Sequence, residues 1–194
     1  MRRAGHRSSV ERDARGEVDA GVGCNVAAGA LGLAARRVVP RRRAFCDPVI
    51  LPDGVYFRVS EFACHTGEPY PEAWADRWAN LVTLCDRIRE RWSRPLTVVS
   101  GYRTSAYNQG LVNGDAARGS HQVASASYHV QGMAADLRPE TSEEVPQLLD
   151  VILRMYAAGE LPELGGCADY PVSCWVHVDC GKAADGHLRR WIGR

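Results

Sequence analysis

Residues 127–136, Ser-Tyr-His-Val-Gln-Gly-Met-Ala-Ala-Asp, decide the fold, because they place His129 and Asp136 seven positions apart on a path from a loop into a strand. Gly132 between them allows the backbone to turn sharply. Further along, the apolar segment Trp-Val-His-Val-Asp at 175–179 contains a second histidine, His177. Two histidines and a carboxylate from separate segments are a usual ligand set for a hydrolytic zinc ion that keeps one position for water. If the three residues meet in space, the pattern predicts a metallohydrolase.

Length and charge predict one folded domain with a tail. The chain has 194 residues, 45% of them hydrophobic, which is enough apolar material for a core. Residues 1–45 hold ten arginines and four acidic residues, a formal charge of +6, whereas the remainder carries −5. We expect residues 1–44 to form a basic, disordered tail and residues 45–194 to form the domain. A basic tail can contact anionic polymers, but no nucleic-acid-binding motif accompanies it, so no nucleic acid partner is expected.

Cysteine spacing and hydropathy leave the compartment open. The seven cysteines form no Cys-x-x-Cys pair, which argues against a zinc-thiolate knuckle. Cys167, Cys174 and Cys180 could form one disulfide or remain free thiols. No segment is long and apolar enough to span a membrane, and residues 21–35 make a poor signal-peptide core because arginines follow them. We expect a monomer, placed in the cell envelope or periplasm if it is exported.

Apolar periodicity predicts two main helices, at 72–92 and 141–157, because large apolar residues recur there at steps of three and four. A short helix is expected at 105–111, followed by a polar loop at 113–127. Strands or extended segments are expected at 57–62, 96–99, 133–137 and 174–178. Helices mixed with a few strands indicate an α+β domain.

Four motifs follow one another along the chain: Ser-Gly-Tyr-Arg-Thr at 100–104, Tyr-Asn at 107–108, Ser-Tyr-His at 127–129 with Gly132, Ala134 and Asp136 behind it, and Val-His-Val-Asp at 176–179. In this order they resemble the zinc D-alanyl-D-alanine peptidases. This group comprises VanY-type carboxypeptidases and cell-wall endopeptidases, which share a fold with the Hedgehog signalling domain. The resemblance covers roughly residues 57–191. It implies a small, mainly antiparallel sheet with flanking helices.

The resemblance also implies roles for individual residues. His129, Asp136 and His177 would be the ligands of Zn²⁺. Arg103 would face the substrate, where a guanidinium can hold a carboxylate or stabilise a developing oxyanion. From the residues alone, a structural ion pair with the second helix or a loop is the alternative. Ser127 would contact the substrate or cap a turn. The substrate would be a peptidoglycan stem peptide that contains D-amino acids.

The general base is less clearly marked. Many members of this group carry an acidic residue three positions before the last ligand histidine, where this chain has Cys174. Asp179 is the preferred candidate, because residues two apart in a strand point the same way and Asp179 would therefore lie beside His177. The alternatives are Asp169, which is expected in the preceding loop and could swing in, and a purely orienting role for Asp179.

The sequence thus predicts a zinc peptidase acting on D-amino-acid-containing bonds of peptidoglycan. It leaves two versions open, a carboxypeptidase that releases a terminal D-alanine and an endopeptidase that cuts a cross-link. The alternative is a zinc-stabilised, non-catalytic binding domain of the same fold, consistent with Cys174 at the acidic position. His121 mimics the ligand motif but has a tyrosine seven positions later, so it is excluded as a ligand.

Overall fold

Helices and strands alternate along the part of the chain that the computed structural model describes, residues 50–119 and 123–193. The elements are η1 (Val59–Phe62), η2 (Glu72–Trp74), α1 (Ala75–Trp92), β1 (Thr97–Ser100), α2 (Ser105–Ala117), β2 (Ala134–Arg138), η3 (Ser142–Glu144), α3 (Val145–Ala157), β3 (Gly166–Tyr170), β4 (Trp175–Asp179) and β5 (Arg189–Ile192). The predicted tail, residues 1–44, and His121 lie outside the described residues.

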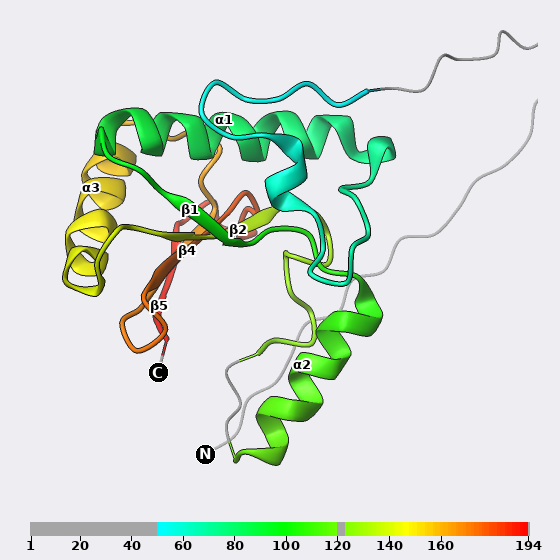
Figure 1. The fold of residues 1–194 in the computed structure, drawn as a ribbon. Coiled ribbons are helices and arrows are strands. Elements are labelled where there is room, and N and C mark those ends of the chain that lie inside the picture. Colours follow the sequence, from blue (N-terminus) through cyan, green and yellow to red (C-terminus); the bar gives the residue numbers. More distant parts are fainter. Residues whose placement is uncertain (1–49, 120–122, 194) are drawn as a thin grey trace, which may run out of the picture. The chain divides into compact units, whose positions relative to one another are not determined.

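The strands form a single five-stranded sheet in the order β1-β2-β4-β3-β5. Its pairs are antiparallel except for β3 and β5, which run parallel. This mixed architecture, drawn in Figure 1, confirms the predicted α+β class with a mainly antiparallel sheet and flanking helices. The two central strands, β2 and β4, come from the two segments in which the sequence placed the candidate ligands.

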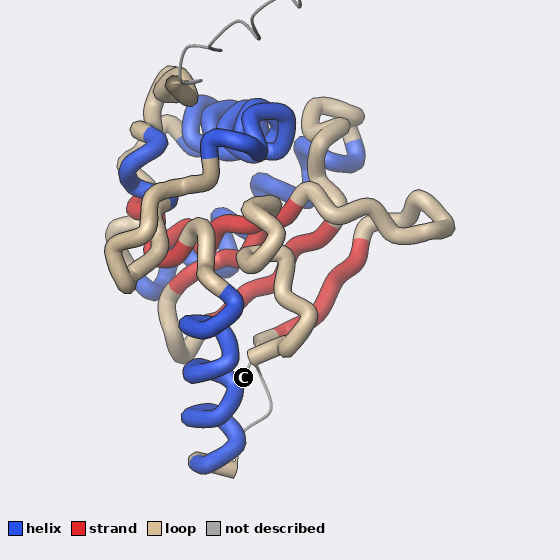
Figure 2. The backbone as a smooth tube through the Cα atoms, turned by 90° about the vertical axis from the view of Figure 1, so that its right-hand side faces the viewer, coloured by secondary structure: helices blue, strands red, loops and turns tan. Residues whose placement is uncertain are grey.

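The two faces of the sheet have different surroundings. Helix α1 lies along one side of the strands (Figure 2), and α3 contacts α1, β3 and β4. Val176 and Val178 of β4 join the apolar core formed with these helices. Side chains alternate between faces along a strand, so His177 and Asp179 point to the opposite side. The polar side chains of His177 and Asp179 therefore lie on the sheet face opposite to the core that packs against α1 and α3.

The apolar stripes of α1 and α3 form as the periodicity predicts. Buried side chains at steps of three and four line each helix: Trp78, Leu81, Leu84, Cys85 and Ile88 in α1, and Val145, Leu148, Ile152 and Met155 in α3. Burying one large apolar side chain stabilises the fold by about 1.5–3 kcal/mol. Helix α1 ends at Trp92. The next residue, Ser93, caps the helix in a left-handed conformation (φ 57°), two positions before Pro95.

Helix α2 is longer than predicted. It continues to Ala117, so the expectation of a loop at residues 113–127 is wrong for residues 113–117. The following segment fastens it: Asn108 Nδ2 donates to the Ala124 carbonyl at 3.1 Å, and the Val123 amide donates to Asp115 Oδ2 at 2.8 Å. These tertiary contacts outweigh the low helix propensity of Gly110 and Gly114.

One further expectation is wrong. Residues 57–62 do not form a strand but end in the 3-10 turn η1, which Glu61 closes by accepting from the Arg58 amide at 2.8 Å. Two strands were not predicted: β3, and the C-terminal segment Arg189–Ile192, which pairs with it as β5. Both strands form by pairing across the sheet, which local sequence does not encode.

Candidate metal centre

The three predicted ligands come from a turn and from the two central strands. His129 lies in a tight turn, where its carbonyl accepts from the Gly132 amide at 3.1 Å. Gly132 has a φ of 64°, a backbone conformation that glycine adopts without strain. The chain then enters β2, and Asp136 pairs directly with His177 of β4. Directly opposite residues share one face of a sheet, so both side chains point toward the turn that carries His129.

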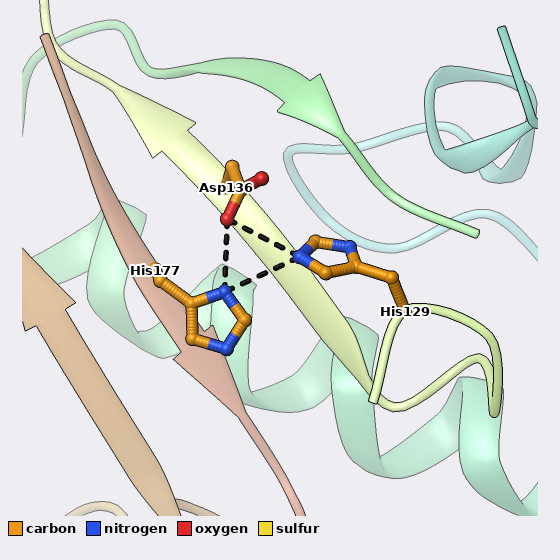
Figure 3. A group of neighbouring side chains, drawn as sticks. All are labelled: His129, Asp136 and His177. Carbon is orange, nitrogen blue, oxygen red and sulfur yellow. Dashed lines mark hydrogen bonds and ion pairs between the residues drawn. The ribbon is translucent and has the colours of Figure 1, made fainter. Parts of the chain in front are cut away.

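Three side-chain donor atoms form a compact triangle, shown in Figure 3. Asp136 Oδ1 lies 2.9 Å from His177 Nδ1 and 3.3 Å from His129 Nε2, and the two nitrogens are 3.2 Å apart. A tetrahedral zinc ion about 2.0–2.1 Å from its ligands separates them by about 3.3–3.4 Å. All three residues are buried. The donor set and its spacing therefore fit a zinc ion with one position left for water.

The ring nitrogens that face away from the triangle have partners of their own. His129 Nδ1 lies 2.7 Å from the Gly101 carbonyl, and His177 Nε2 lies 3.3 Å from Asp179 Oδ2. Both oxygens are acceptors, so each of these nitrogens carries the proton and donates. When both rings are neutral, the lone pairs of His129 Nε2 and His177 Nδ1 therefore point into the triangle, as metal binding requires.

The charges of the three groups are strongly coupled. Burial lowers the pKa of His129. Burial also disfavours protonated His177, but its hydrogen bonds to Asp136 and Asp179 outweigh this effect and raise its pKa to about 9. For Asp136, burial is outweighed by the two neighbouring histidines, which hold its pKa well below the usual range. An ionised carboxylate buried beside two imidazoles is a site that a cation can occupy in place of a proton.

The triangle opens into a cleft of about 350 Å³ that is lined by residues from several elements. Among its lining residues are Arg118, which follows α2, and several residues between Val123 and His129. Tyr170, Trp175 and Trp191, from β3, β4 and β5, add aromatic rings to the lining. A chain segment lying in this cleft would meet both polar groups and ring faces.

Comparison with known proteins now decides the family. A peptidase M15 family model, described as peptidoglycan L,D-endopeptidase MepK, matches residues 77–191, which is more than half of the chain and includes all three donors. The chain belongs to this family. The resemblance seen in the motifs is thereby confirmed at the level of the zinc D-alanyl-D-alanine peptidase superfamily.

One curated relative supports the same assignment. The probable peptidoglycan L,D-endopeptidase MepK of Haemophilus influenzae is 32% identical over 98 residues. That alignment covers 50% of this chain and 43% of the relative, so the chain matches less than half of the relative's length. No solved structure is a significant match.

In this member of the M15 family, Arg103 contacts the ligand set. Its Nη2 donates to Asp136 Oδ2 at 2.8 Å and its Nε donates to Ser100 Oγ at 2.8 Å. The side chain is 14% exposed and also lines the cleft. Arg103 thus forms an ion pair, but with Asp136 of β2 and not with the second helix or a loop, the partners considered from the sequence. The predicted substrate contact of Arg103 stays a prediction.

Ser127, the other predicted substrate residue, lines the cleft as well. Its Oγ accepts from the His129 amide at 3.3 Å, which is the capping geometry of a turn. Both roles considered for Ser127 are therefore compatible with its position.

The candidate bases lie in different surroundings. Asp179 is fully buried and contacts His177 on the side remote from the triangle. The expectation of a loop at Asp169 is wrong, because Asp169 lies in strand β3. It pairs with Val176, a core residue of β4, so its side chain lies on the face opposite to His177. Cys174 adopts a left-handed backbone (φ 62°), and its thiol lies 3.7 Å from the Pro171 carbonyl. The assignment of a general base to Asp179 or Asp169 stays a prediction.

Sequence reasoning missed Arg189. No motif marks it in the sequence, yet its Nη2 donates to Asp179 Oδ1 at 2.5 Å and it lines the cleft. The local signal was weak, because an arginine beside Arg190 in an exposed segment looks like a solvated charge. Its partner ten residues earlier becomes evident only once β5 pairs with β3.

The described cysteines are free thiols, which settles the alternative between one disulfide and none for Cys167, Cys174 and Cys180. In the described residues, no helix has the length and apolarity needed to cross a bilayer.

Proposed function

We propose that this chain is a zinc-dependent peptidoglycan endopeptidase, with the activity residing in residues 45–194. The bond cut would be an amide between L- and D-configured centres in stem peptides or their cross-links. The observation that carries the proposal is the buried His129, Asp136 and His177 triangle at the edge of an open cleft, in a chain that belongs to a peptidase family.

The chain's own groups divide the work. His129, Asp136 and His177 would hold the ion, which when bound supplies a polarised carbonyl and a water of lowered pKa. Arg103 would keep Asp136 oriented through its Nη2 contact and offer its remaining donors to the carbonyl oxygen as negative charge develops. Ser127 would hold the His129 turn and contact the peptide backbone.

The comparisons favour an endopeptidase over a carboxypeptidase. The family model that matches residues 77–191 and the curated relative from Haemophilus influenzae are both described as peptidoglycan L,D-endopeptidases. Residues from α2, from the segment before β2 and from β3, β4 and β5 line the cleft beside the triangle, and a cross-linked peptide would lie against them.

The test is digestion of purified muropeptides, terminal and cross-linked, followed by mass spectrometry. Zinc-loaded protein is expected to divide cross-linked muropeptides into two fragments, and a chelator should abolish cleavage. Loss of a single terminal residue would instead identify a carboxypeptidase. His129→Ala should abolish zinc binding and cleavage together, and His187→Ala, at an exposed loop histidine, is the matched control. Zinc-loaded protein that releases no fragment from either substrate would refute the proposal.

Cys174 supports a second candidate, a zinc-stabilised binding domain without hydrolysis. Its thiol faces the Pro171 and Val172 carbonyls and supplies no carboxylate. This candidate predicts that zinc-loaded protein retains muropeptides on a column but leaves their masses unchanged. Cleavage at a rate that depends on zinc would exclude it.

A further inference from the structure

Asp179 borders the cleft, but groups of the protein engage both of its carboxylate oxygens. It is 0% exposed, and its Oδ1 accepts from the Gly181 amide at 2.8 Å and from Arg189 Nη2 at 2.5 Å. Its Oδ2 accepts from His177 Nε2 at 3.3 Å. Both oxygens are therefore engaged with groups of the protein.

The imidazole of His177 separates Asp179 from the donor triangle. Nδ1 of His177 points to Asp136 Oδ1, whereas Nε2, on the other side of the ring, points to Asp179. A general base must come within hydrogen-bond reach of the water from which it takes a proton. That water would sit on the Nδ1 side of the ring, so Asp179 is placed to hold the ring and not to reach the water.

Arg189 connects Asp179 to the turn of the first histidine. Besides its contact with Asp179, Nη2 donates to the Gly181 carbonyl at 2.8 Å, and its guanidinium lies over the ring of Tyr128, 4.5 Å from the centroid. Tyr128 immediately precedes His129. One side chain from the edge strand β5 thus links the end of β4 with the segment that carries the other histidine.

Glycines keep the space that this arrangement occupies. A Cβ at Gly166 would lie 2.4 Å from Asp179 Oδ2 and 2.9 Å from Arg189 Nη2. A Cβ at Gly181 would lie 2.2 Å from the Tyr128 ring. Gly166 therefore leaves room for the Asp179–Arg189 pair, and Gly181 leaves room for the Tyr128 ring on which the Arg189 guanidinium lies.

We propose that Asp179 and Arg189 form a positioning pair that fixes the ring and the tautomer of His177 for metal binding, and that Asp179 is not the proton acceptor. The inference rests on the proposed function, since it assumes that His177 Nδ1 binds zinc. Partners that orient metal-ligating histidines typically change metal affinity by about 10–100-fold when they are replaced.

The decisive variant is Asp179→Asn, which keeps the size of the side chain but can present an N–H to His177 Nε2. That donor would favour the tautomer with the proton on Nδ1, where zinc must bind. We expect the zinc dissociation constant, measured by chelator competition, to rise about 10–100-fold. Arg189→Gln should weaken zinc binding at the lower end of this range, and Arg189→Lys should retain part of the wild-type affinity. Asp150→Asn and Arg190→Gln, at exposed positions, are the matched controls.

A second measurement separates positioning from base catalysis. At saturating zinc, Asp179→Asn should keep kcat within about tenfold of the wild type with an unchanged pH profile, whereas loss of a general base costs about 10²–10⁴-fold. The visible spectrum of the cobalt-substituted variant should differ from the wild type, because the ring orientation at the ion changes.

An unchanged zinc affinity in both Asp179→Asn and Arg189→Gln, or the larger loss of kcat together with loss of one limb of the pH profile, would overturn the inference. If Asp179→Asn does not fold by circular dichroism, Arg189→Gln carries the test, because its side chain is 32% exposed. Failure of the proposed function appears separately, as absence of muropeptide cleavage by the wild type, and does not alter the ratio of zinc affinities.

Discussion

The turn between the first two candidate ligands offers a prediction whose magnitude follows from geometry. Gly132 has a φ of 64°, and a Cβ built on it would lie 2.7 Å from Trp74 Cε3 and 2.7 Å from Tyr70 Oη. Gly132→Ala therefore adds left-handed backbone strain, about 1–2 kcal/mol, to an overpacking cost of about 1–3 kcal/mol. The free energy of unfolding should fall by about 2–5 kcal/mol, which lowers the melting temperature of a domain of this size by about 5–15 °C.

Gly159→Ala is the matched control for this change. Its φ is 74°, but no atom lies within 4 Å of the added Cβ, so only the strain applies. Thermal unfolding of both variants in the presence of a chelator measures the fold without the ion. Zinc titration of Gly132→Ala should then show weaker binding, because the turn carries His129. A loss of stability in Gly132→Ala no greater than that in Gly159→Ala would refute the packing argument.

Three further predictions concern charges and thiols. Arg103→Gln leaves the buried Asp136 carboxylate without its ion pair and should lower the free energy of unfolding by about 3–5 kcal/mol; an unchanged melting curve would show that Arg103 serves substrate alone. Because the pKa of His177 is raised to about 9, this group is protonated at pH 7, and zinc binding should release about one proton, measured by calorimetry in buffers of different ionisation enthalpy. Burial raises the pKa of Cys180 to about 12, so iodoacetamide at pH 8 should leave it intact while modifying Cys174, as mass spectrometry will show.

The elements that sequence predicted well are those with a strong local signal. The stripe of α1, from Trp78 to Ile88, repeats at helical spacing, and the structure buries it as expected. The strand β5 gives no such signal, because two arginines, an aromatic residue and an exposed Ile192 show neither alternation nor burial. Its formation depends on pairing with β3, a contact that only the folded sheet provides.

The candidate site divides along the same line. His129 and Asp136 are marked by their spacing around Gly132, and His177 stands out as a polar residue within an apolar strand. The arrangement of Asp179 was only half visible: alternation along β4 correctly placed it on the same face as His177. The sequence did not reveal that Asp179 contacts Nε2 of His177, because this depends on side-chain directions. It did not reveal the contact of Asp179 with Arg189 either, because Arg189 lies on strand β5.

The position of β5 also affects the order in which the helices and the sheet form during folding. Gly166 of β3 pairs with Arg189 of β5, and the donors on β2 and β4 lie far apart in the chain. Closing such loops costs entropy before any long-range contact is gained, whereas helices such as α1 form from local contacts. Competence to hold an ion should therefore arise late in refolding, after helical signal has recovered. A zinc-sensitive dye added during refolding would then report the formation of the sheet through the uptake of zinc. Far-ultraviolet circular dichroism is dominated by the helices and reports this step only weakly.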